Sequence, residues 1–356
     1  MTRSVTFVVP GSLATRTGGY EYDRRMIDAL RGRNWAVAVR ELVGEFPHAS
    51  SNARSGAASM LAACPDGMVV IIDGLALGAL PAEVEREAGR LSIVALVHMP
   101  LADETGLSQR QADEFRTMEQ RALAACRLVI VTGRSTVDTL VAYGIDRARI
   151  VVVEPGTDRA PLARGSRSGS VHLLSIATVH AGKGHELLVR ALASVTTRNW
   201  RLTIAGSLER DRASAERLRA AVAAAGLEDH VSLTGEADAA SVAALYDDAD
   251  VFVLATLKES YGMAVAEALA RGLPIVSTTT GAIPSLVGDD AGILVPPGDI
   301  NALTRALSRV IDDEPLRRRL AEGARRVRDR LPGWDAAGHK LSITLEQIVG
   351  NERVAF

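Results

Sequence analysis

Residues 251–269, VFVLATLKESYGMAVAEAL, contain the pattern that decides the fold. The apolar run Val251–Leu254 predicts a short buried strand, and the residues from Gly262 onward have the spacing of a helix. A buried strand that leads through a loop into a helix is the repeating unit of a parallel α/β sheet. Ligands bind at the carboxyl ends of the strands in such sheets, and Glu259 and Glu267 flank the start of the helix there.

The same alternation of strands and helices runs along the whole chain. It is interrupted once, near 154–170, where Pro, Gly and Ser indicate a linker. We therefore predict an α/β fold of two Rossmann-like domains that face each other across a cleft. The expected domains are residues 1–160 and 161–335, and a C-terminal helix in 336–356 is expected to pack back toward the first.

In the first half we predict six strands, most of them separated by helices. The strands are Val5–Val9, Ala36–Val39, Met68–Ile72, Ile93–Val97, Leu128–Val131 and Ile150–Val153, and examples of the helices are Tyr22–Arg31, Gln109–Ala125 and Ser135–Tyr143. In the second half we expect strands at Val171–Ile176, Leu202–Ala205, Val231–Thr234, Val251–Leu254, Ile275–Ser277 and Gly292–Val295. Helices are expected at Gly184–Val195, Arg212–Ala225, Ala239–Asp247, Gly262–Arg271 and Asn301–Ile311, and two more within 315–349.

Composition excludes several classes of protein. The 356 residues are 47% hydrophobic and carry a net charge of -2, which indicates a folded protein with no general attraction to nucleic acid. Cys64 and Cys126 lie in Ala-rich helical stretches, so we expect free thiols. No apolar run is long enough for a membrane span, and the amino terminus leads directly into a strand, so a cytoplasmic enzyme is expected. The basic run 317–330 is interpreted as a solvated helix face, with attraction to a membrane surface as the less favoured alternative.

The acids around the helix start at Gly262 suit a particular kind of ligand. Glycine lets the backbone approach a ligand closely, and the free N–H groups and dipole of a helix start favour a phosphate. Glu259 and Glu267 can accept paired hydrogen bonds from vicinal hydroxyls, so the segment favours a nucleoside diphosphate sugar. Spacing alone fits two solvated helix-end acids equally well.

Four further features stand at strand ends. Lys183, in AGKGHE at 181–186, can neutralise a diphosphate, or it is a surface lysine at a helix start. Gly18 and Gly19 allow close approach of a ligand, or they form a plain turn. His98 follows one strand and is either a site residue or a structural histidine. Asp73 follows another and either faces an acceptor or caps a turn.

The segment 259–269 and its continuation resemble the retaining glycosyltransferases of family 4, which have the two-Rossmann-domain (GT-B) architecture. The motifs that continue the family pattern are GLPIV at 272–276, GAIP at 281–284, GILV at 292–295 and PGD at 297–299. The resemblance is strong from about residue 170 to 313 and weaker elsewhere. This ordered match is far more specific than the two glutamates alone.

The resemblance implies a role for each matching residue. Glu259 would contact the transferred sugar, Glu267 the ribose hydroxyls, and Lys183 the phosphates, while His98 would touch the sugar near the reaction centre. The implied catalytic residues are His98, Lys183 and Glu259. The implied donor-binding residues are Gly18, Gly19, Lys183, Gly206, Glu259, Tyr261, Gly262, Met263 and Glu267.

One position departs from the family pattern. The family has an arginine five residues before the lysine, and this chain has Thr178 there. His180 or backbone amides are the candidates to compensate. The diphosphate is therefore expected to depend more on Lys183 and the helix start at Gly262 than it does in relatives.

The sequence thus predicts transfer of a hexose-type sugar, with retention, from a nucleoside diphosphate sugar to a hydroxylated acceptor. UDP or GDP is the expected nucleotide, and the acceptor is a small molecule, a lipid or a glycan. No metal or other cofactor is expected. The alternatives are a nucleotide-sugar epimerase of the same architecture and a non-catalytic nucleotide-sugar-binding protein. A nicotinamide enzyme is disfavoured because no G-x-G-x-x-G opens the first helix. The sequence does not indicate an oligomeric state.

Overall fold

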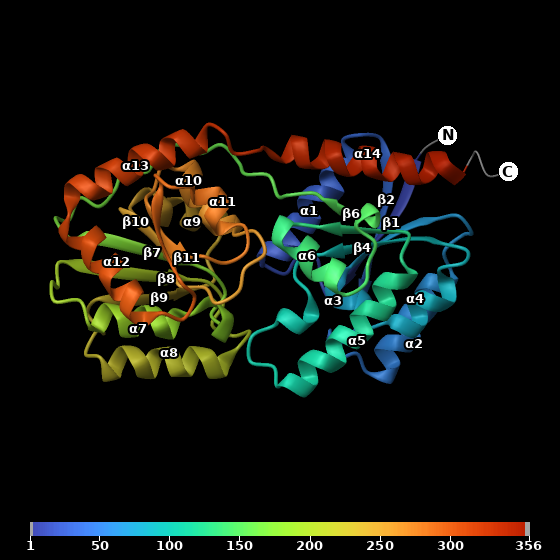
Figure 1. Cartoon of the computed structure of the whole chain (residues 1–356), viewed down its shortest axis with the longest axis horizontal. Coiled ribbons are helices and arrows are strands. Elements are labelled where there is room, and N and C mark those ends of the chain that lie inside the picture. Colours follow the sequence, from blue (N-terminus) through green and yellow to red (C-terminus); the bar gives the residue numbers. More distant parts are fainter. Residues whose placement is uncertain (1–2, 353–356) are drawn as a thin grey trace. The chain divides into compact units, whose positions relative to one another are not determined.

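A computed structural model describes residues 3–352, which form two compact units. The first unit extends to Gly156 and resumes at Pro332, and the second unit is Thr157–Leu331. Each unit contains a six-stranded parallel sheet with helices on both faces (Figure 1). The predicted α/β class with two Rossmann-like domains is confirmed.

The sheet of the first unit has the strand order β2-β1-β3-β4-β5-β6. The chain places β2 on one side of β1 and β3 on the other, so the order reverses between β1 and β3. The strands are β1 (Arg3–Pro10), β2 (Trp35–Leu42), β3 (Val69–Asp73), β4 (Ser92–Val97), β5 (Leu128–Val131) and β6 (Ile150–Val152). The helices are α1 (Gly18–Arg31), α2 (Ser51–Ala62), α3 (Gly74–Leu77), α4 (Pro81–Glu87), α5 (Gln109–Ala125), α6 (Arg134–Ala142) and α14 (Trp334–Glu352), with short 3-10 turns η1 (Leu101–Asp103) and η2 (Arg147–Arg149).

The sheet of the second unit has the order β12-β11-β10-β7-β8-β9, and it reverses between β7 and β10. Its strands are β7 (Val171–Ile176), β8 (Trp200–Ala205), β9 (Val231–Gly235), β10 (Val251–Leu254), β11 (Ile275–Thr278) and β12 (Gly292–Val295). Its helices are α7 (His185–Ala193), α8 (Arg212–Ala224), α9 (Ala239–Asp247), α10 (Met263–Ala270), α11 (Ile283–Val287), α12 (Ile300–Asp312) and α13 (Glu314–Arg328), with the 3-10 turn η3 (Ala181–Lys183).

The start of α1 differs from the prediction. The helix begins at Gly18 and not at Tyr22, so the two glycines lie in its first turn and not in a loop. The reason is the Thr17 side chain, which accepts a hydrogen bond from the Tyr20 amide and caps the helix. Because Gly is a poor helix former, sequence periodicity placed the start too late.

The carboxyl-terminal helix α14 belongs to the first unit and packs on α1. Trp35 Nε1 donates to Ser342 Oγ at 2.9 Å, and Arg33 forms an ion pair with Asp335. A Cβ on Gly338 would lie 2.3 Å from the Cβ of Ala29, so the two helices approach closely. The chain therefore returns to its first unit after completing the second.

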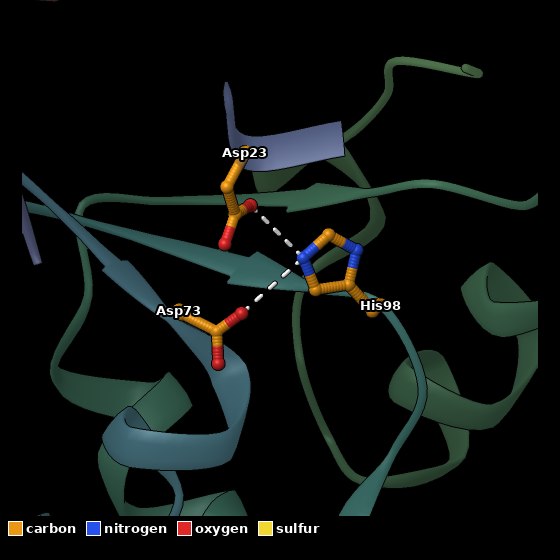
Figure 2. Close-up of side chains that lie close together, drawn as sticks. All are labelled: Asp23, Asp73 and His98. Carbon is orange, nitrogen blue, oxygen red and sulfur yellow. Dashed lines mark hydrogen bonds and ion pairs between the residues drawn. The ribbon is translucent and has the colours of Figure 1, made fainter. Parts of the chain in front are cut away.

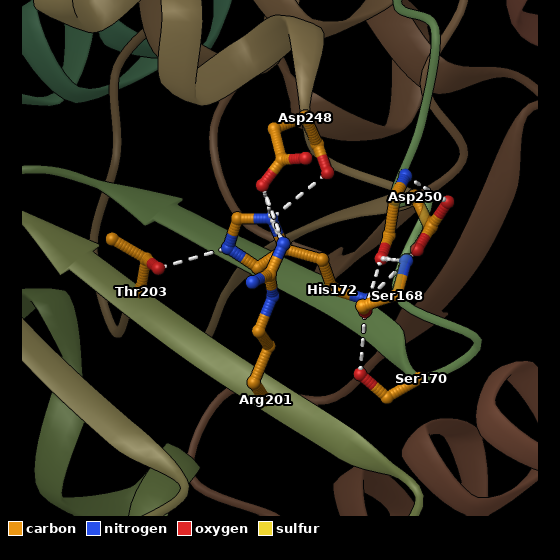
Figure 3. Close-up of polar contacts among 8 residues, drawn as sticks. Ser168, Ser170, His172, Arg201, Thr203, Asp248 and Asp250 are labelled. Atoms are coloured by element: carbon orange, nitrogen blue, oxygen red, sulfur yellow. Dashed lines mark hydrogen bonds and ion pairs between the residues drawn. The ribbon is translucent and has the colours of Figure 1, made fainter.

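The linker is attached to the amino-terminal edge of the second sheet (Figure 3). Asp250 accepts hydrogen bonds from the backbone amides of Ser166 at 3.0 Å and of His172 at 2.8 Å. The buried His172 ring lies 2.8 Å from Thr203 Oγ1 and 2.9 Å from the Asp248 carbonyl oxygen. The Asp250 carboxylate and the contacts of the His172 ring therefore fix the start of β7. This start lies at the edge of the sheet opposite the carboxyl ends of the strands, where ligands bind.

Two further expectations concern cysteines and membrane spans. Cys126 is buried and Cys64 partly buried, and both are free thiols, as expected. Among residues 3–352, no helix has the length and apolar character that a membrane crossing requires.

Candidate functional site

The loops that follow β7 and β10 lie together, since these strands are neighbours at the point where the strand order reverses. The Leu257 amide donates to the Gly182 carbonyl oxygen at 2.7 Å, and the Thr256 hydroxyl lies 3.1 Å from that oxygen. Gly184 has a φ of 65°, and a Cβ there would lie 2.0 Å from the Ala255 carbonyl oxygen. The close approach of the two loops therefore requires glycine at 184.

This contact brings Lys183 and Glu259 into an ion pair. Lys183 Nζ donates to Glu259 Oε2 at 2.7 Å, and the two side chains are 22% and 17% exposed. Both charged groups remain accessible to a ligand at the carboxyl edge of the sheet. The sequence placed each at a strand end, and the structure brings the two together.

Helix α10 begins beside this pair. Gly262 is its N-cap residue with a φ of 95°, and Met263 is its first residue. Among residues 3–352, no side chain caps the first turn, so its amides can donate hydrogen bonds to an anion. Tyr261 is buried and packs against Ala266 and Ala282. It therefore contributes to the support of the helix start.

The loop after β11 holds the backbone of Glu259 in place. The Ala282 amide donates to the Ser260 carbonyl oxygen at 3.0 Å. Gly281 has a φ of 57°, and a Cβ there would lie 1.8 Å from the Glu259 carbonyl oxygen. The GAIP motif at 281–284 thus fixes the position of the first glutamate.

Glu267 is oriented by a residue that the sequence analysis missed. The hydroxyl of the buried Tyr246 lies 3.0 Å from Glu267 Oε2, and Arg271 stacks over the Tyr246 ring at 4.3 Å. Burial and then the charge of Glu267 raise the pKa of Tyr246 well above its usual range, so the phenol is neutral and can donate. No local motif marks Tyr246, because it lies on α9, 21 residues before its partner.

The loops after β7 and β8 approach each other at Thr178 and Gly206. A Cβ on Gly206 would lie 2.0 Å from the Ala177 carbonyl oxygen and 2.9 Å from the Thr178 amide nitrogen. His180 caps the turn η3, where its Nδ1 accepts a hydrogen bond from the Gly182 amide at 3.2 Å. Burial, followed by the charge of Lys183, lowers the pKa of His180, so it adds no positive charge at neutral pH. His180 therefore does not replace the missing arginine as a cation.

His98 lies in the first unit with two carboxylates around its Nε2 atom (Figure 2). Nε2 is 3.1 Å from Asp23 Oδ1 and 3.2 Å from Asp73 Oδ2. Gly19, in the first turn of α1, lies against the ring, since a Cβ there would be 3.4 Å from His98 Cδ2. Gly18 is the residue before it, at the start of α1. Asp73 also caps α3 by accepting the Leu75 amide at 2.8 Å, so it both caps a turn and faces the histidine.

The carboxylates control the charge of His98. Burial alone lowers the pKa of the histidine, but the charges and hydrogen bonds of Asp23 and Asp73 raise it to about 10. Burial raises the pKa of Asp23, which is fully buried. The ligand atoms of the three residues lie within 4.8 Å of one another, a spacing that could also hold a metal ion. Nothing in the sequence marks Asp23 as a site residue, because it is one of several charged residues in a predicted helix.

The candidate residues thus form two groups, each described within its own unit. Lys183, Glu259, Glu267 and the start of α10 lie at the strand-order reversal of the second sheet. Gly19, His98 and their carboxylates lie beside the reversal of the first sheet, where β1 and β3 meet. A cation, free amides and carboxylates at one edge are the groups that a phosphorylated polyol requires.

Comparison with known proteins supports this interpretation of the second unit. Residues 160–327 match the family described as glycosyl transferases group 1. The D-inositol 3-phosphate glycosyltransferase of Xylanimonas cellulosilytica is 32% identical over 237 residues, which cover 62% of this chain and 56% of that protein. The chain thus spans little more than half the length of this curated relative.

Two solved structures share the fold of the whole chain. Sucrose-phosphate synthase from Thermosynechococcus elongatus has a TM-score of 0.82 and 20% identity over 98% of this chain and all of that one. The Anabaena protein HepE, solved in complex with UDP-glucose, has a TM-score of 0.77 and 15% identity over 96% of this chain and 99% of that one. Both comparisons support the GT-B architecture.

Proposed function

We propose that this chain, whose residues 160–327 match the glycosyl transferases group 1 family, transfers a hexose-type sugar from a nucleoside diphosphate sugar to a hydroxylated acceptor. The observation that supports it best is the ion pair of Lys183 and Glu259 beside the uncapped start of α10. Such an arrangement offers a cation and free amides to a diphosphate and a carboxylate to the sugar. HepE, which has the same fold, was solved with UDP-glucose bound.

Each residue has a role in this proposal. Lys183 and the amides at Gly262 and Met263 bind the diphosphate, Glu259 binds the sugar, and Glu267, oriented by Tyr246, binds the ribose hydroxyls. The Lys183 ammonium lies between Glu259 and the diphosphate and stabilises the charge that develops on the leaving oxygen. This role needs no divalent cation or other cofactor.

The reaction proposed is a front-face substitution that retains the anomeric configuration. The bond between the anomeric carbon and the diphosphate oxygen breaks, and its electron pair stays on the diphosphate. The acceptor oxygen forms the new bond to the anomeric carbon on the same face, and its proton passes to the departing phosphate. The resemblance to retaining enzymes supports retention.

A non-catalytic nucleotide-sugar-binding protein is the second candidate. The observation that favours it is Thr178, which removes one cation from the diphosphate site. Because His180 is held neutral, it adds no second charge to that of Lys183, which pairs with Glu259. Reduced stabilisation of the leaving group would slow transfer more than it would weaken binding.

Turnover with UDP- and GDP-hexoses tests the proposal. The purified chain is incubated with each donor, with and without sugar or polyol phosphates, and released nucleoside diphosphate and products are followed by mass spectrometry. We expect nucleotide release to depend on an acceptor and to yield a product heavier by one hexosyl residue. Donor binding without release, across all acceptors, would favour the binding protein. Nucleotide release with conversion of the donor sugar in the absence of any acceptor would indicate an epimerase.

A further inference from the structure

The environment of His98 is unusual because two carboxylates face the same ring nitrogen. Asp23 comes from α1, Asp73 from the end of β3, and His98 directly follows β4 (Figure 2). All three therefore converge beside the point where the strand order of the first sheet reverses. That is where ligands bind in open α/β sheets.

The carboxylates are buried, and the histidine is partly buried. Asp23 is 0% and Asp73 5% exposed, whereas the His98 side chain is 24% exposed. Among the described residues, Asp23 Oδ2 has no hydrogen-bond partner. A buried carboxylate costs free energy unless a positive charge faces it, and His98 is the group placed to supply one.

The surrounding groups favour the charged form of His98. The two aspartates raise its pKa to about 10, against the effect of burial. Tyr22 packs edge-to-face on the ring at 5.3 Å, but its hydroxyl donates to the Val153 carbonyl oxygen and burial keeps it neutral. Arg24 acts on the cluster by lowering the pKa of Asp23. The contacts of Nε2 with the two carboxylates therefore favour the imidazolium form of His98.

The geometry fits a proton shared between the histidine and the two carboxylates. Nε2 lies at 3.1 and 3.2 Å from the two oxygens, which are hydrogen-bond distances for one shared N–H. Gly19 and Tyr22 both lie against the ring, since a Cβ on Gly19 would be 3.4 Å from Cδ2 and the Tyr22 ring lies edge-to-face at 5.3 Å. Nδ1 lies on the side of the ring away from both carboxylates (Figure 2).

We propose that Asp23 and Asp73 are positioning residues that hold His98 as an imidazolium, so that its Nδ1–H donates a charge-assisted hydrogen bond to a ligand oxygen. The ligand oxygen is a hydroxyl or a phosphate oxygen, and this part rests on the proposed function. The charge state and orientation of His98 do not depend on the proposed function. A neutral histidine with Nε2–H bound to the carboxylates would present an acceptor at Nδ1, so the aspartates decide which ligand atoms His98 recognises.

Nitrogen NMR of the full-length protein, labelled with 15N-histidine, tests the proposal directly. His98→Gln assigns the His98 signals, and the exposed His339 on α14 is the internal control. We expect His98 to stay protonated on both nitrogens up to about pH 9 in the wild type. In Asp23→Asn and in Asp73→Asn its pKa should fall toward the ordinary value of about 6.5, while the NMR signals of His339 stay at their wild-type positions.

Several outcomes would overturn the proposal. These are titration of His98 near or below its ordinary pKa in the wild type, a His98 pKa in both asparagine variants that equals the wild-type value, or a stoichiometric metal ion whose removal by EDTA changes the His98 signals. If Asp23→Asn does not fold, the wild-type titration and Asp73→Asn still decide. None of these measurements requires turnover, so failure of the proposed function would be seen separately.

Stability against pH gives a second readout. Because the folded pKa of about 10 exceeds the ordinary value of 6.5, the stabilisation from His98 is present below pH 6.5 and lost as the pH rises through about 10. The urea midpoint of the wild type should therefore fall more steeply from pH 7 to 10 than that of His98→Gln. Parallel curves would contradict the proposal.

The pH profile of transfer separates positioning from a purely structural role. In the wild type, kcat/KM should show no loss attributable to His98 up to about pH 9. In Asp73→Asn it should fall about tenfold as the pH rises past about 7, because the charge-assisted hydrogen bond is lost. A uniform loss at every pH would contradict the proposed role.

Discussion

Replacement of Glu259 by glutamine is expected to lower kcat/KM for sugar transfer by about a hundredfold. The amide keeps the size of the side chain but removes the negative charge that faces Lys183 at 2.7 Å. In the proposed complex it also exchanges a charged acceptor for a neutral amide at the sugar hydroxyls. Two charge-assisted contacts are weakened together, each worth about 1.5–3 kcal/mol when lost.

The fold should survive this change. Gly281 packs against the backbone carbonyl of Glu259, and replacement of the side chain by glutamine leaves that backbone contact in place. Glu228→Gln is the matched control, because Glu228 is exposed and precedes β9 at the opposite edge of the sheet. Steady-state kinetics on both variants, with circular dichroism, would check the prediction. Wild-type kcat/KM in Glu259→Gln would rule out the assigned role.

Gly281→Ala is expected to destabilise the second unit by about 3 kcal/mol. Its φ of 57° is unfavourable for alanine, and the added Cβ would lie 1.8 Å from the Glu259 carbonyl oxygen. That atom belongs to the backbone and cannot move without displacing Glu259. The variant should therefore lose both stability and activity.

Gly298→Ala separates the two causes. Gly298 also has a positive φ, 79°, but an added Cβ would meet no atom within 4 Å. Its substitution should cost only about 1–2 kcal/mol for the backbone conformation. Urea unfolding of both variants measures the difference. Equal losses would show that contact with Glu259 contributes nothing to the effect of Gly281→Ala.

Much of the fold follows from local sequence pattern. The limits of β7, β10 and β12 agree with prediction, because each is a short segment made mostly of apolar residues. The bounds of α2 and α4 were not predicted, although the Ala-rich stretch 61–64 at the end of α2 was interpreted as helical. The first is rich in Ala, Ser and Gly, and the second has only seven residues, so neither shows a clear helical period.

The candidate site was predicted as separate residues, and its contacts were not. Lys183 and Glu259 each follow a strand, but their pairing depends on β7 and β10 being neighbours, which local pattern does not encode. Asp23 and Tyr246 were missed for the same reason. Each lies on a helix among ordinary helical residues. The contacts of Asp23 with His98 and of Tyr246 with Glu267 form only when the sheet has folded.

Thermal denaturation in the presence of UDP, GDP and their hexose conjugates tests most directly whether the second unit binds a nucleotide sugar. Since a ligand that binds only the folded state raises the melting temperature, at least one of these compounds should stabilise the wild type. Glu267→Ala should weaken that shift, because the carboxylate held by Tyr246 is the proposed ribose contact. An unchanged melting temperature with every one of these ligands would contradict the proposed function, and an equal shift in Glu267→Ala would contradict the role of that residue.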